Sequence, residues 1–508
     1  MKRSVPVNAF TEALNKAGLL LSVSCGPGDV TDAGDVSGVT YNSKEVGPDS
    51  LFVCKGAHFR EKYLEDAEAA GASCYVTEVP YGLGTPGCRE ILVSDIRLAM
   101  PVIAETFYGR LSDKLHMIGI TGTKGKSTTA YFMRYILDDY MAAQGGKATA
   151  ICSGIDNYDG IINEESHLTT PEIIELYQHM DHALNSGIEY MTMEVSSQAL
   201  KYDRVDGITF EAGVFMNIGT DHISAIEHPD FDDYLNSKLR LFSHCRKACY
   251  NLDCDEQERI ATASEDCPYV ITFSQKNINA NVYGYDIKSD EGKVTFRVHV
   301  KDIDGIDDFD EEITLGVFGT INVENALAAI ALSALLRVPV EYIQSGLAKA
   351  ISPGRMEVFY SKDGRRIAIV DYAHNKLSYE KFFDTIRDEF PDKKIMIVFG
   401  CPGGKAFARR EELGTIAGQN CVYSIITEED CGEEDVEKIC REIGEFVAAA
   451  GGKYEIITDR VEAIRKAITL MDDDTILFLP GKGRETREKR GIQYIDTPSD
   501  ADVVIKYM

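Results

Sequence analysis

The sequence predicts an α/β protein of three domains, with a mainly parallel sheet covered by helices in the central domain. Three observations lead to this prediction. The chain has 508 residues, which is longer than a domain with a single hydrophobic core usually is. Short apolar runs alternate with helical stretches along most of it, which is typical of parallel sheets with helices on both faces. A glycine-rich loop also stands between one apolar run and an amphipathic helix.

The first domain is expected over residues 1–113. Short β-rich runs and turn signals fill it, at 36–43, 50–56 and 72–78, and the helical stretch EKYLEDAEAAG (61–71) lies between the last two. This pattern indicates a small α/β domain.

The second domain is expected over residues 114–352. It opens with an apolar strand, the glycine-rich loop and an amphipathic helix within 115–139. The runs YMTMEV (190–195) and AGVFMN (212–217) are further strands. Residues 268–316 are β-rich, and a helix is predicted for the segment NVENALAAIALSALL (322–336).

The third domain is expected over residues 353–508, after the turn at Pro353-Gly354. Its predicted strands end in Gly, Asp or His, and helical stretches separate them. They are RRIAIVDYAH, KKIMIVFG, CVYSIIT and DTILFLPGKG. Ligands of open α/β sheets bind where such strands end, so these polar ends are candidate site residues.

Composition excludes several classes of partner. The formal net charge of −29 disfavours nucleic acid and anionic membranes. The N-terminus lacks the apolar core of a signal peptide, and no run of 18 apolar residues predicts a membrane-spanning helix. Thirteen scattered cysteines without an export signal favour a reducing compartment, so we expect a cytoplasmic protein. We also expect a monomer, although the sequence does not give the oligomeric state.

The glycine-rich loop predicts an ATP site. Backbone N–H groups and a helix N-terminus favour phosphate, Lys126 would reach the β- and γ-phosphates, and Ser127 would bind Mg²⁺. The generic spacing is only partly met, because Ile120 stands where a glycine is expected. A glycine-rich turn without a ligand is the alternative. The expected phosphate-binding residues are Gly122, Thr123, Lys124, Gly125, Lys126, Ser127 and Thr128.

The loop TGTKGKST resembles that of the Mur ligases, a family that includes folylpolyglutamate synthase. Other segments follow in the family's order and cover nearly the whole chain. They are LTTPE (168–172), MEVSSQAL (193–200), FMNIGTDHI (215–223), YLNSKLRLF (234–242), NVENALAA (322–329), PGRMEV (353–358), VDYAHN (370–375) and GKGRET (481–486). The resemblance is strongest to the muramyl-tripeptide synthetases, the MurE group, of the streptococcal, lysine-adding type.

The resemblance implies an architecture and a reaction. The domains would be a UDP-binding N-terminal domain, a central P-loop ATPase-like domain and a Rossmann-like domain for the amino acid. ATP would phosphorylate the D-Glu γ-carboxylate of UDP-N-acetylmuramoyl-L-Ala-D-Glu, and an amino acid would displace phosphate from the acyl phosphate. This step belongs to peptidoglycan biosynthesis, on which cell shape and division depend.

The resemblance also implies the catalytic residues Lys126, Glu194, His222 and Lys238. Ser127, Glu194 and His222 would lie at Mg²⁺, together with a carbamate formed from CO₂ on Lys238. Taken alone, Glu194 and His222 would be ordinary hydrogen-bonded residues, and Lys238 a surface lysine.

Further residues are expected in the substrate sites. Asn322, Asn325, Arg355 and Asp371 would bind ATP; helix and turn roles are their alternatives. The UDP-muramyl-peptide set is Ser43, Thr169, Thr170, Ser196 and Arg204. Tyr202 stands where some relatives carry Gln, so the family's contact at that position is not expected here.

The choice of amino acid depends on Glu429-Asp430-Cys431-Gly432. Relatives that add meso-diaminopimelate carry Asp-Asn-Pro-Arg there, and the Arg pairs with the distal carboxylate. Gly432 replaces that Arg, and two acids suit a cation, so we expect L-lysine, with Lys405 and Glu485 nearby. The alternatives are ornithine, meso-diaminopimelate, a folylpolyglutamate synthase-type ligase, a lipid-linked acceptor or a non-catalytic nucleotide-binding scaffold.

Overall fold

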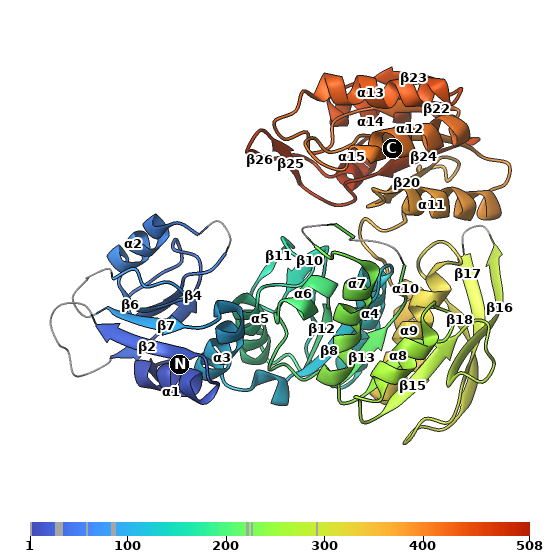
Figure 1. The fold of residues 1–508 in the computed structure, drawn as a ribbon. Helices are drawn as coiled ribbons and strands as arrows, with labels where there is room; N and C mark the ends of the chain where they lie inside the picture. The colour runs from blue at the N-terminus through green and yellow to red at the C-terminus, as the bar shows by residue number, and fades with distance from the viewer. Residues whose placement is uncertain are drawn as a thin grey trace. The chain divides into compact units, whose positions relative to one another are not determined.

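The computed structural model describes residues 3–25, 34–56, 59–82, 88–219, 223–224, 227–290 and 293–508 (Figure 1). His222, one of the expected catalytic residues, therefore lies outside the described residues. The chain divides into two compact units. The first comprises residues 1–126 and 141–271, and the second comprises residues 127–140 and 272–508.

The first unit begins with a five-stranded sheet in the order β2-β7-β6-β5-β4. Only the β2–β7 pair is antiparallel. Its strands are β2 (Leu20–Cys25), β4 (Gly38–Thr40), β5 (Ser50–Val53), β6 (Ala72–Thr77) and β7 (Arg89–Val93). The helices are α1 (Val7–Lys16), α2 (Glu61–Ala69) and α3 (Ile96–Tyr108), and the short strands β1 (Val5–Pro6) and β3 (Asp35–Val36) pair with each other.

The rest of the first unit is built on strands in the order β11-β10-β9-β12-β8-β13-β14-β15. Strands β9, β12, β8, β13 and β14 are parallel. The strands are β8 (His116–Thr121), β9 (Ala150–Cys152), β10 (Asp156–Tyr158), β11 (Asn163–Glu165), β12 (Tyr190–Glu194), β13 (Ala212–Phe215), β14 (Ala248–Asn251) and β15 (Val270–Ser274). The helices are α5 (Ile173–Asn185), α6 (Ser197–Lys201), α7 (Phe231–Leu239) and α8 (Gln257–Ser264), with 3₁₀ turns η1 (Leu111–Asp113) and η2 (Arg240–His244).

The second unit contains most of helix α4 (Lys126–Ala143) and a run of strands in the order β15-β16-β17-β18. The strands are β16 (Val282–Asp290), β17 (Lys293–Val300) and β18 (Phe309–Thr314), and the helices are α9 (Asn322–Leu335) and α10 (Val340–Lys349). Helices α4 and α10 pack closely, since a Cβ on Gly346 would lie 2.5 Å from Ile136 Cα. Only glycine fits there.

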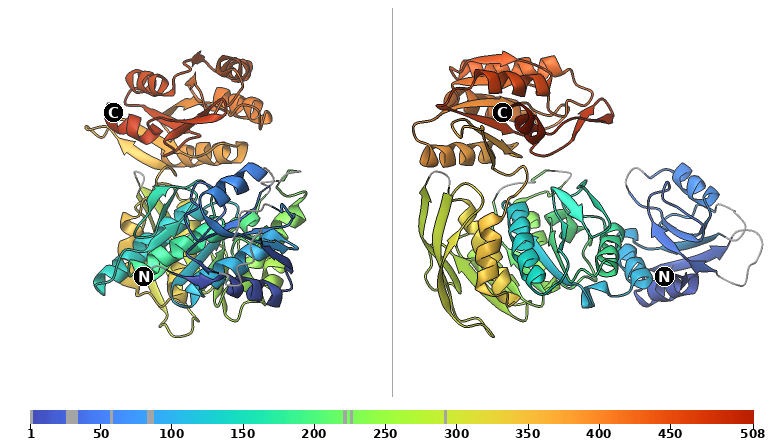
Figure 2. Two further views of the ribbon diagram at one scale, coloured as in Figure 1. Left: turned by 90° about the vertical axis from the view of Figure 1, so that its left-hand side faces the viewer. Right: turned by 180° about the vertical axis from the view of Figure 1, so that it is seen from behind.

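The C-terminal part of this unit is a six-stranded sheet in the order β19-β20-β24-β21-β22-β23, in which only β19 is antiparallel. Its strands are β19 (Glu357–Tyr360), β20 (Ile367–Asp371), β21 (Lys394–Phe399), β22 (Tyr423–Ile426), β23 (Tyr454–Ile456) and β24 (Thr475–Pro480). Helices α11 (Lys376–Glu389), α12 (Ala408–Asn420) and α13 (Val436–Ala449) lie on one face, and α14 (Arg460–Leu470) and α15 (Asp500–Tyr507) on the other (Figure 2). The hairpin β25 (Arg487–Arg490) and β26 (Gln493–Asp496) follows β24.

Alternation along strand β20 explains the two-faced core of this sheet. Ile367 and Ile369 pack into one apolar cluster, and Ala368 and Val370 pack into the other. Successive side chains of a strand point to opposite faces, so a continuous apolar run fits a sheet buried on both sides.

The expected strands and helices are confirmed, including 190–195 as β12, 212–217 as β13 and the four C-terminal runs as β20, β21, β22 and β24. The α/β class is confirmed as well. The division at residues 113 and 352 stays a prediction. Among the described residues, no helix is both long and apolar enough to cross a membrane.

Candidate active site

The glycine-rich loop joins strand β8 to helix α4, as the sequence predicts. Strand β8 ends at Thr121 and α4 begins at Lys126. Gly125, which precedes the helix, has a φ of +84°, a left-handed conformation that favours glycine. A Cβ on Gly122 would lie only 3.0 Å from Met216 Cβ, so the loop backbone runs close to the next strand. This strand–loop–helix geometry is suited to binding phosphate.

Asn217 holds the loop in this conformation. Its Oδ1 accepts hydrogen bonds from the backbone N–H groups of Thr123 (3.1 Å) and Lys124 (2.9 Å), and its Nδ2 donates to the carbonyl oxygen of Lys124 (3.2 Å). Asn217 is not among the site residues that the sequence predicts. The feature that could have identified Asn217 is its position directly after a strand, in FMNIGTDHI.

The lysines and hydroxyls of the loop are close to its backbone. Lys126 Nζ donates to the carbonyl oxygens of Gly122 (3.0 Å) and Thr123 (3.3 Å). Ser127 and Thr128 are 7% and 8% exposed. The ammonium group of Lys126 thus lies beside the loop that would hold the phosphates.

Lys238 lies at the same loop, although it is 112 residues away from Lys126 in sequence. The residue is 2% exposed, and its Nζ donates to the carbonyl oxygen of Gly122 at 2.8 Å. Its Nζ also lies 4.8 Å from the centre of the Tyr234 ring, whose hydroxyl is 3.1 Å from Thr123 Oγ1. Helix α7 therefore brings Lys238 and Tyr234 to the loop together, and Lys238 is not a surface lysine.

Glu194 is the last residue of β12 and is 2% exposed. It pairs in register with Ile120 of β8, so it lies at the sheet edge from which the loop starts. Its Oε1 accepts a hydrogen bond from the backbone N–H of Gly154 at 2.7 Å. A carboxylate and a serine hydroxyl are hard oxygen donors and fit Mg²⁺. The described residues contain no cluster of three His, Cys, Asp or Glu side chains that would hold a metal alone.

Three of the residues expected at the muramyl peptide lie together beside Glu194. Thr170 Oγ1 donates to the carbonyl oxygen of Glu194 (2.9 Å) and accepts from the backbone N–H of Ser196 (3.0 Å). Ser196 caps helix α6 by accepting from Ala199 N–H. The Arg204 guanidinium lies 3.5 Å from the carbonyl oxygen of Thr170.

Glu172 links this group to the first sheet. Its carboxylate pairs with Arg204 Nη2 (3.0 Å) and with Lys55 Nζ (2.6 Å), which also lies 4.6 Å from the Tyr41 ring centre. Thr169 is half-buried next to Thr170, and Ser43 is half-buried in the turn after β4. The role of Glu172 was not foreseen, because the partners are far apart in sequence.

The residues expected to bind ATP in the second unit have defined surroundings. Asn325 Nδ2 donates to Asn322 Oδ1 at 2.9 Å, on one face of α9. The carboxylate of Asp371, at the end of β20, accepts from the backbone N–H groups of Met356 and Ala373, both at 2.6 Å. The guanidinium of Arg355 lies 4.7 Å from the Tyr372 ring centre, and its Nη2 is 3.4 Å from Ser127 Oγ.

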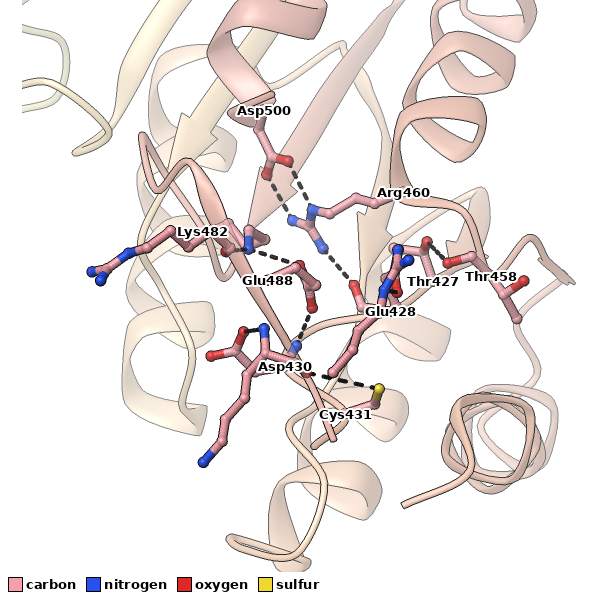
Figure 3. A network of polar contacts seen from close by, with 12 residues as sticks. Thr427, Glu428, Asp430, Cys431, Thr458, Arg460, Lys482, Glu488 and Asp500 are labelled. Carbon is pink, nitrogen blue, oxygen red and sulfur yellow. Dashed lines mark hydrogen bonds and ion pairs between the residues drawn. The ribbon is translucent and has the colours of Figure 1, made fainter. Parts of the chain in front are cut away.

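The segment expected to select the amino acid is bonded to the β25–β26 hairpin (Figure 3). The Asp430 carboxylate accepts from the backbone N–H of Lys489 at 2.8 Å, and its own N–H donates to the Glu488 carboxylate. Gly432 N–H donates to the carbonyl oxygen of Lys489 at 3.0 Å. Asp430 is thus engaged in holding the hairpin, and Gly432 forms a β-bridge to Arg490.

Two ion pairs hold the hairpin, one to the residues after β24 and one to the segment. Lys482 Nζ lies 2.7 Å from a Glu488 carboxylate oxygen, and both side chains are 2% exposed. Glu428 accepts two hydrogen bonds from the Arg490 guanidinium. The segment and the hairpin therefore behave as one structure.

Glu429 is surrounded by other acids. Its carboxyl group packs against the backbone, since a Cβ on Gly481 would lie 2.3 Å from Glu429 Oε2. Burial raises the pKa of Glu429 to about 8, and the neighbouring carboxylates of Glu488, Asp430 and Glu485 add to the rise, against the opposing charge of Arg460. A cation placed here would favour the ionised form.

The other two residues of the expected amino-acid set lie on adjacent segments. Lys405 is exposed on the loop after β21, where Gly403 N–H donates to the carbonyl oxygen of Asp430 at 3.2 Å. Glu485 is hydrogen-bonded to Tyr372, which contributes with burial to raising the pKa of that tyrosine. Lys405, Glu429, Asp430 and Glu485 thus lie on segments that touch one another.

The sequence matches two protein families. Residues 120–333 match the Mur ligase middle domain, and residues 354–483 match the family described as Mur ligase, glutamate ligase domain. The chain is 36% identical over 474 residues to the UDP-N-acetylmuramoyl-L-alanyl-D-glutamate--L-lysine ligase of Enterococcus faecalis, covering 93% of this chain and 91% of that protein. It is also 36% identical to a UDP-N-acetylmuramyl-tripeptide synthetase of Lactobacillus delbrueckii subsp. bulgaricus, covering 92% of each.

The fold agrees with a solved structure of a UDP-N-acetylmuramoyl-L-alanyl-D-glutamate--2,6-diaminopimelate ligase. The TM-score is 0.63 at 23% identity, with 95% of this chain and 97% of that chain covered. At this identity the likeness concerns the fold alone. The long alignments at 36% identity carry the assignment, and by them this chain belongs to the Mur ligase family, in its group of UDP-N-acetylmuramyl-tripeptide synthetases.

Proposed function

We propose that the chain is an ATP-dependent ligase that adds L-lysine to the D-Glu γ-carboxylate of UDP-N-acetylmuramoyl-L-Ala-D-Glu. The observation that carries the proposal is the phosphate loop with Lys126, Glu194 and Lys238 gathered at its edge, in a chain 36% identical to an L-lysine ligase over almost its full length. The products are the tripeptide precursor, ADP and phosphate.

The reaction has two steps. A γ-carboxylate oxygen of D-Glu attacks the γ-phosphorus of ATP, and ADP leaves. The lysine amine then attacks the acyl carbon, loses a proton, and phosphate leaves with the C–O bond electrons. Anionic groups must meet in the first step, so positioning and charge neutralisation do most of the catalytic work.

The nucleotide would be held by the phosphate loop and by four further residues. Lys126 supplies a fixed cation at the loop, and the loop N–H groups supply hydrogen bonds to phosphate oxygens. Gly122, Thr123, Lys124, Gly125, Ser127 and Thr128 complete the loop, and Asn322, Asn325, Arg355 and Asp371 are assigned to the nucleotide as well.

Mg²⁺, when bound, neutralises triphosphate charge, and Ser127, Glu194 and His222 are the residues assigned to hold it. Lys238 joins them as a carbamate. The Lys238 ammonium group would first lose a proton; the neutral amine would then form an N–C bond to CO₂ and release a second proton, so that a cation is replaced by an anion. Its position 2.8 Å from Gly122 O supports this assignment, because a carbamate there would lie beside the phosphates.

The acceptor would bind along the first unit. Ser43 is assigned to the uridine, and Thr169, Thr170, Ser196 and Arg204 to the muramyl peptide. The shared contacts of Thr170, Ser196 and Arg204 beside Glu194 support this. They would place the D-Glu carboxylate near Glu194, at the edge of the sheet where strand β12 ends.

L-Lysine is proposed because its ammonium group suits the acidic surroundings of Glu429. Glu485 is assigned to the α-amino group, and Lys405 to the amino-acid site. No arginine stands at Gly432 to pair with the distal carboxylate of diaminopimelate. Asp430 contributes charge, while its carboxylate holds the hairpin.

The same proposal assigns residues 1–113 to UDP, 114–352 to ATP and 353–508 to the amino acid. It places the enzyme in the cytoplasm, where nucleotide-linked precursors are found, acting as a monomer.

The test is ATP-dependent phosphate release with UDP-N-acetylmuramoyl-L-Ala-D-Glu and L-lysine, L-ornithine or meso-diaminopimelate, with the product mass determined. We expect release with L-lysine and a product one lysine residue heavier, and none from Lys126→Met. A diaminopimelate product would keep the ligase and overturn the choice of lysine. No release with any amino acid, from folded protein, would overturn the ligase proposal.

A further inference from the structure

A fully buried histidine, His228, joins helix α6 to helix α7. It is 0% exposed, and both of its ring nitrogens are bonded. Nε2 lies 2.9 Å from Ser197 Oγ, and Nδ1 lies 2.6 Å from Asp233 Oδ2. Ser197 is the first residue of α6 and Asp233 lies in the first turn of α7.

The order of groups is that of a serine–histidine–aspartate triad, but the surroundings do not suit a hydrolase. Ser197 is 4% exposed and His228 is not exposed at all, so an acyl carbon could not reach Ser197 Oγ without displacing packed atoms. A nucleophilic serine needs that access. The three groups therefore serve to connect elements.

The hydrogen bonds fix the tautomer of the neutral ring. A carboxylate only accepts, so Nδ1 carries the proton toward Asp233, and Nε2 accepts from the Ser197 hydroxyl. Asp233 also accepts from Lys201 Nζ at 2.6 Å, and Lys201 Nζ donates to the carbonyl oxygen of Glu227 at 3.1 Å. Both ends of α6 are thus bonded to α7 or to the segment that leads into it.

Helix α7 continues the connection to the phosphate loop. The His228 ring meets the Tyr234 ring edge-on, with centroids 5.1 Å apart and planes at 65°. Tyr234 Oη lies 3.1 Å from Thr123 Oγ1, and Lys238 Nζ donates to Gly122 O one turn further along. A shift of α7 would therefore move both of its contacts with the loop.

We propose that His228 is a positioning residue that couples the acceptor-side helix α6 to the phosphate loop by fixing helix α7, and with it Tyr234 and Lys238. The inference rests on the proposed function and deepens it. His228 acts through α7, because a side chain that is 0% exposed offers no surface to a substrate. A displacement of about 1 Å at reacting groups costs about 100-fold in rate, so the coupling bears directly on turnover.

The first test compares His228→Asn with His179→Asn. The asparagine still reaches one neighbour but cannot span from Ser197 to Asp233. His179 of helix α5 is a matched control, because it is 6% exposed and its Nδ1 lies 2.7 Å from a buried Asp159 oxygen. We expect His228→Asn to lower kcat about 10- to 100-fold while the KM for L-lysine changes less than about threefold, and His179→Asn to change kcat less than about threefold.

The second test is a double-mutant cycle of Ser197→Ala and Tyr234→Phe, measured on kcat. Each removes only a hydroxyl, so the cycle also serves if His228→Asn fails to fold. Coupled groups give a combined loss smaller than the product of the single losses. Independent effects would overturn the proposal, and so would equal losses of kcat in the two histidine variants.

A failure of the proposed function would look different. In that case the parent protein would release no phosphate with any amino acid. The coupling would then be measured as the change in ADP affinity that the UDP-muramyl dipeptide causes. We expect a change in the parent and none in His228→Asn; an equal change in both would overturn the coupling.

Discussion

Glu429 is a carboxyl group held in the uncharged form by its surroundings. Its pKa of about 8 reflects burial and the three carboxylates around it. Lys238 is the opposite case, a cation held in the interior beside a backbone carbonyl. On the proposed function, Glu429 would ionise when the substrate's cation arrives, and Lys238 would become an anion when CO₂ adds. A strongly shifted pKa such as that of Glu429 is typical of functional sites.

Glu429→Gln should raise the KM for L-lysine about 10- to 100-fold, because a hydrogen bond between charged groups contributes about 1.5–3 kcal/mol. In the parent, this KM should fall as pH rises from 6.5 to 8.5 and Glu429 ionises, whereas in Glu429→Gln it should stay flat. Glu433→Gln, at an exposed neighbouring acid, is the control. Parallel pH profiles in parent and Glu429→Gln would contradict this role.

The same pKa has a consequence for stability. Since the folded pKa is raised above the unfolded value of 4.5, the stability that Glu429 contributes is fully present below pH 4.5 and is lost as pH rises through about 8. Urea unfolding should therefore show Glu429→Gln gaining stability relative to the parent between pH 6 and pH 9. A constant difference over that range would argue against the raised pKa.

At the scale of elements, apolar patterning was sufficient for the strands and helices. The run IAIV within β20 predicted a strand, and the structure shows that it is buried on both faces, with Ile367 and Ala368 in different clusters. The loop residues Lys126 and Ser127 were identifiable because loop, strand and helix are adjacent in sequence. Contacts over long separations were not: Asn217 lies 94 residues from Thr123, and Asp430 lies 59 residues from Lys489. Such pairings are set by tertiary packing, which a local sequence pattern does not predict.

The β25–β26 hairpin depends on the buried pair of Lys482 and Glu488. Lys482→Met leaves Glu488 as an unpaired buried charge, so we expect a loss of about 3–5 kcal/mol in the free energy of unfolding of the second unit. Lys482→Met combined with Glu488→Gln should lose clearly less, since no buried charge remains. Lys506→Met, at an exposed helical lysine, is the control, and denaturant unfolding is the measurement. A double variant as unstable as the single one would show that the ion pair does not hold the hairpin.

At the scale of the whole molecule, 82 acidic and 53 basic side chains give the net charge of −29. Self-repulsion of this size destabilises the compact state, and salt screens it. We expect Tm to rise by a few degrees between about 10 and 200 mM NaCl, measured by calorimetry at constant pH. Choline chloride should act equally if screening is the cause. A Tm that falls with either salt would mean that favourable ion pairs outweigh the repulsion.

The close fit around Gly403 limits how specificity can be exchanged between relatives. A Cβ at Gly403 would lie 1.9 Å from the carbonyl oxygen of Cys431, and Gly491 N–H donates to the carbonyl oxygen of Gly432. The loop after β21, segment 428–432 and the hairpin thus form one structural unit. We expect the three segments to change together, both in evolution and in engineered variants. Grafting a foreign four-residue motif at 429–432 would leave it facing the wrong neighbours. A chimaera that recruits a new amino acid has to transplant all three segments together.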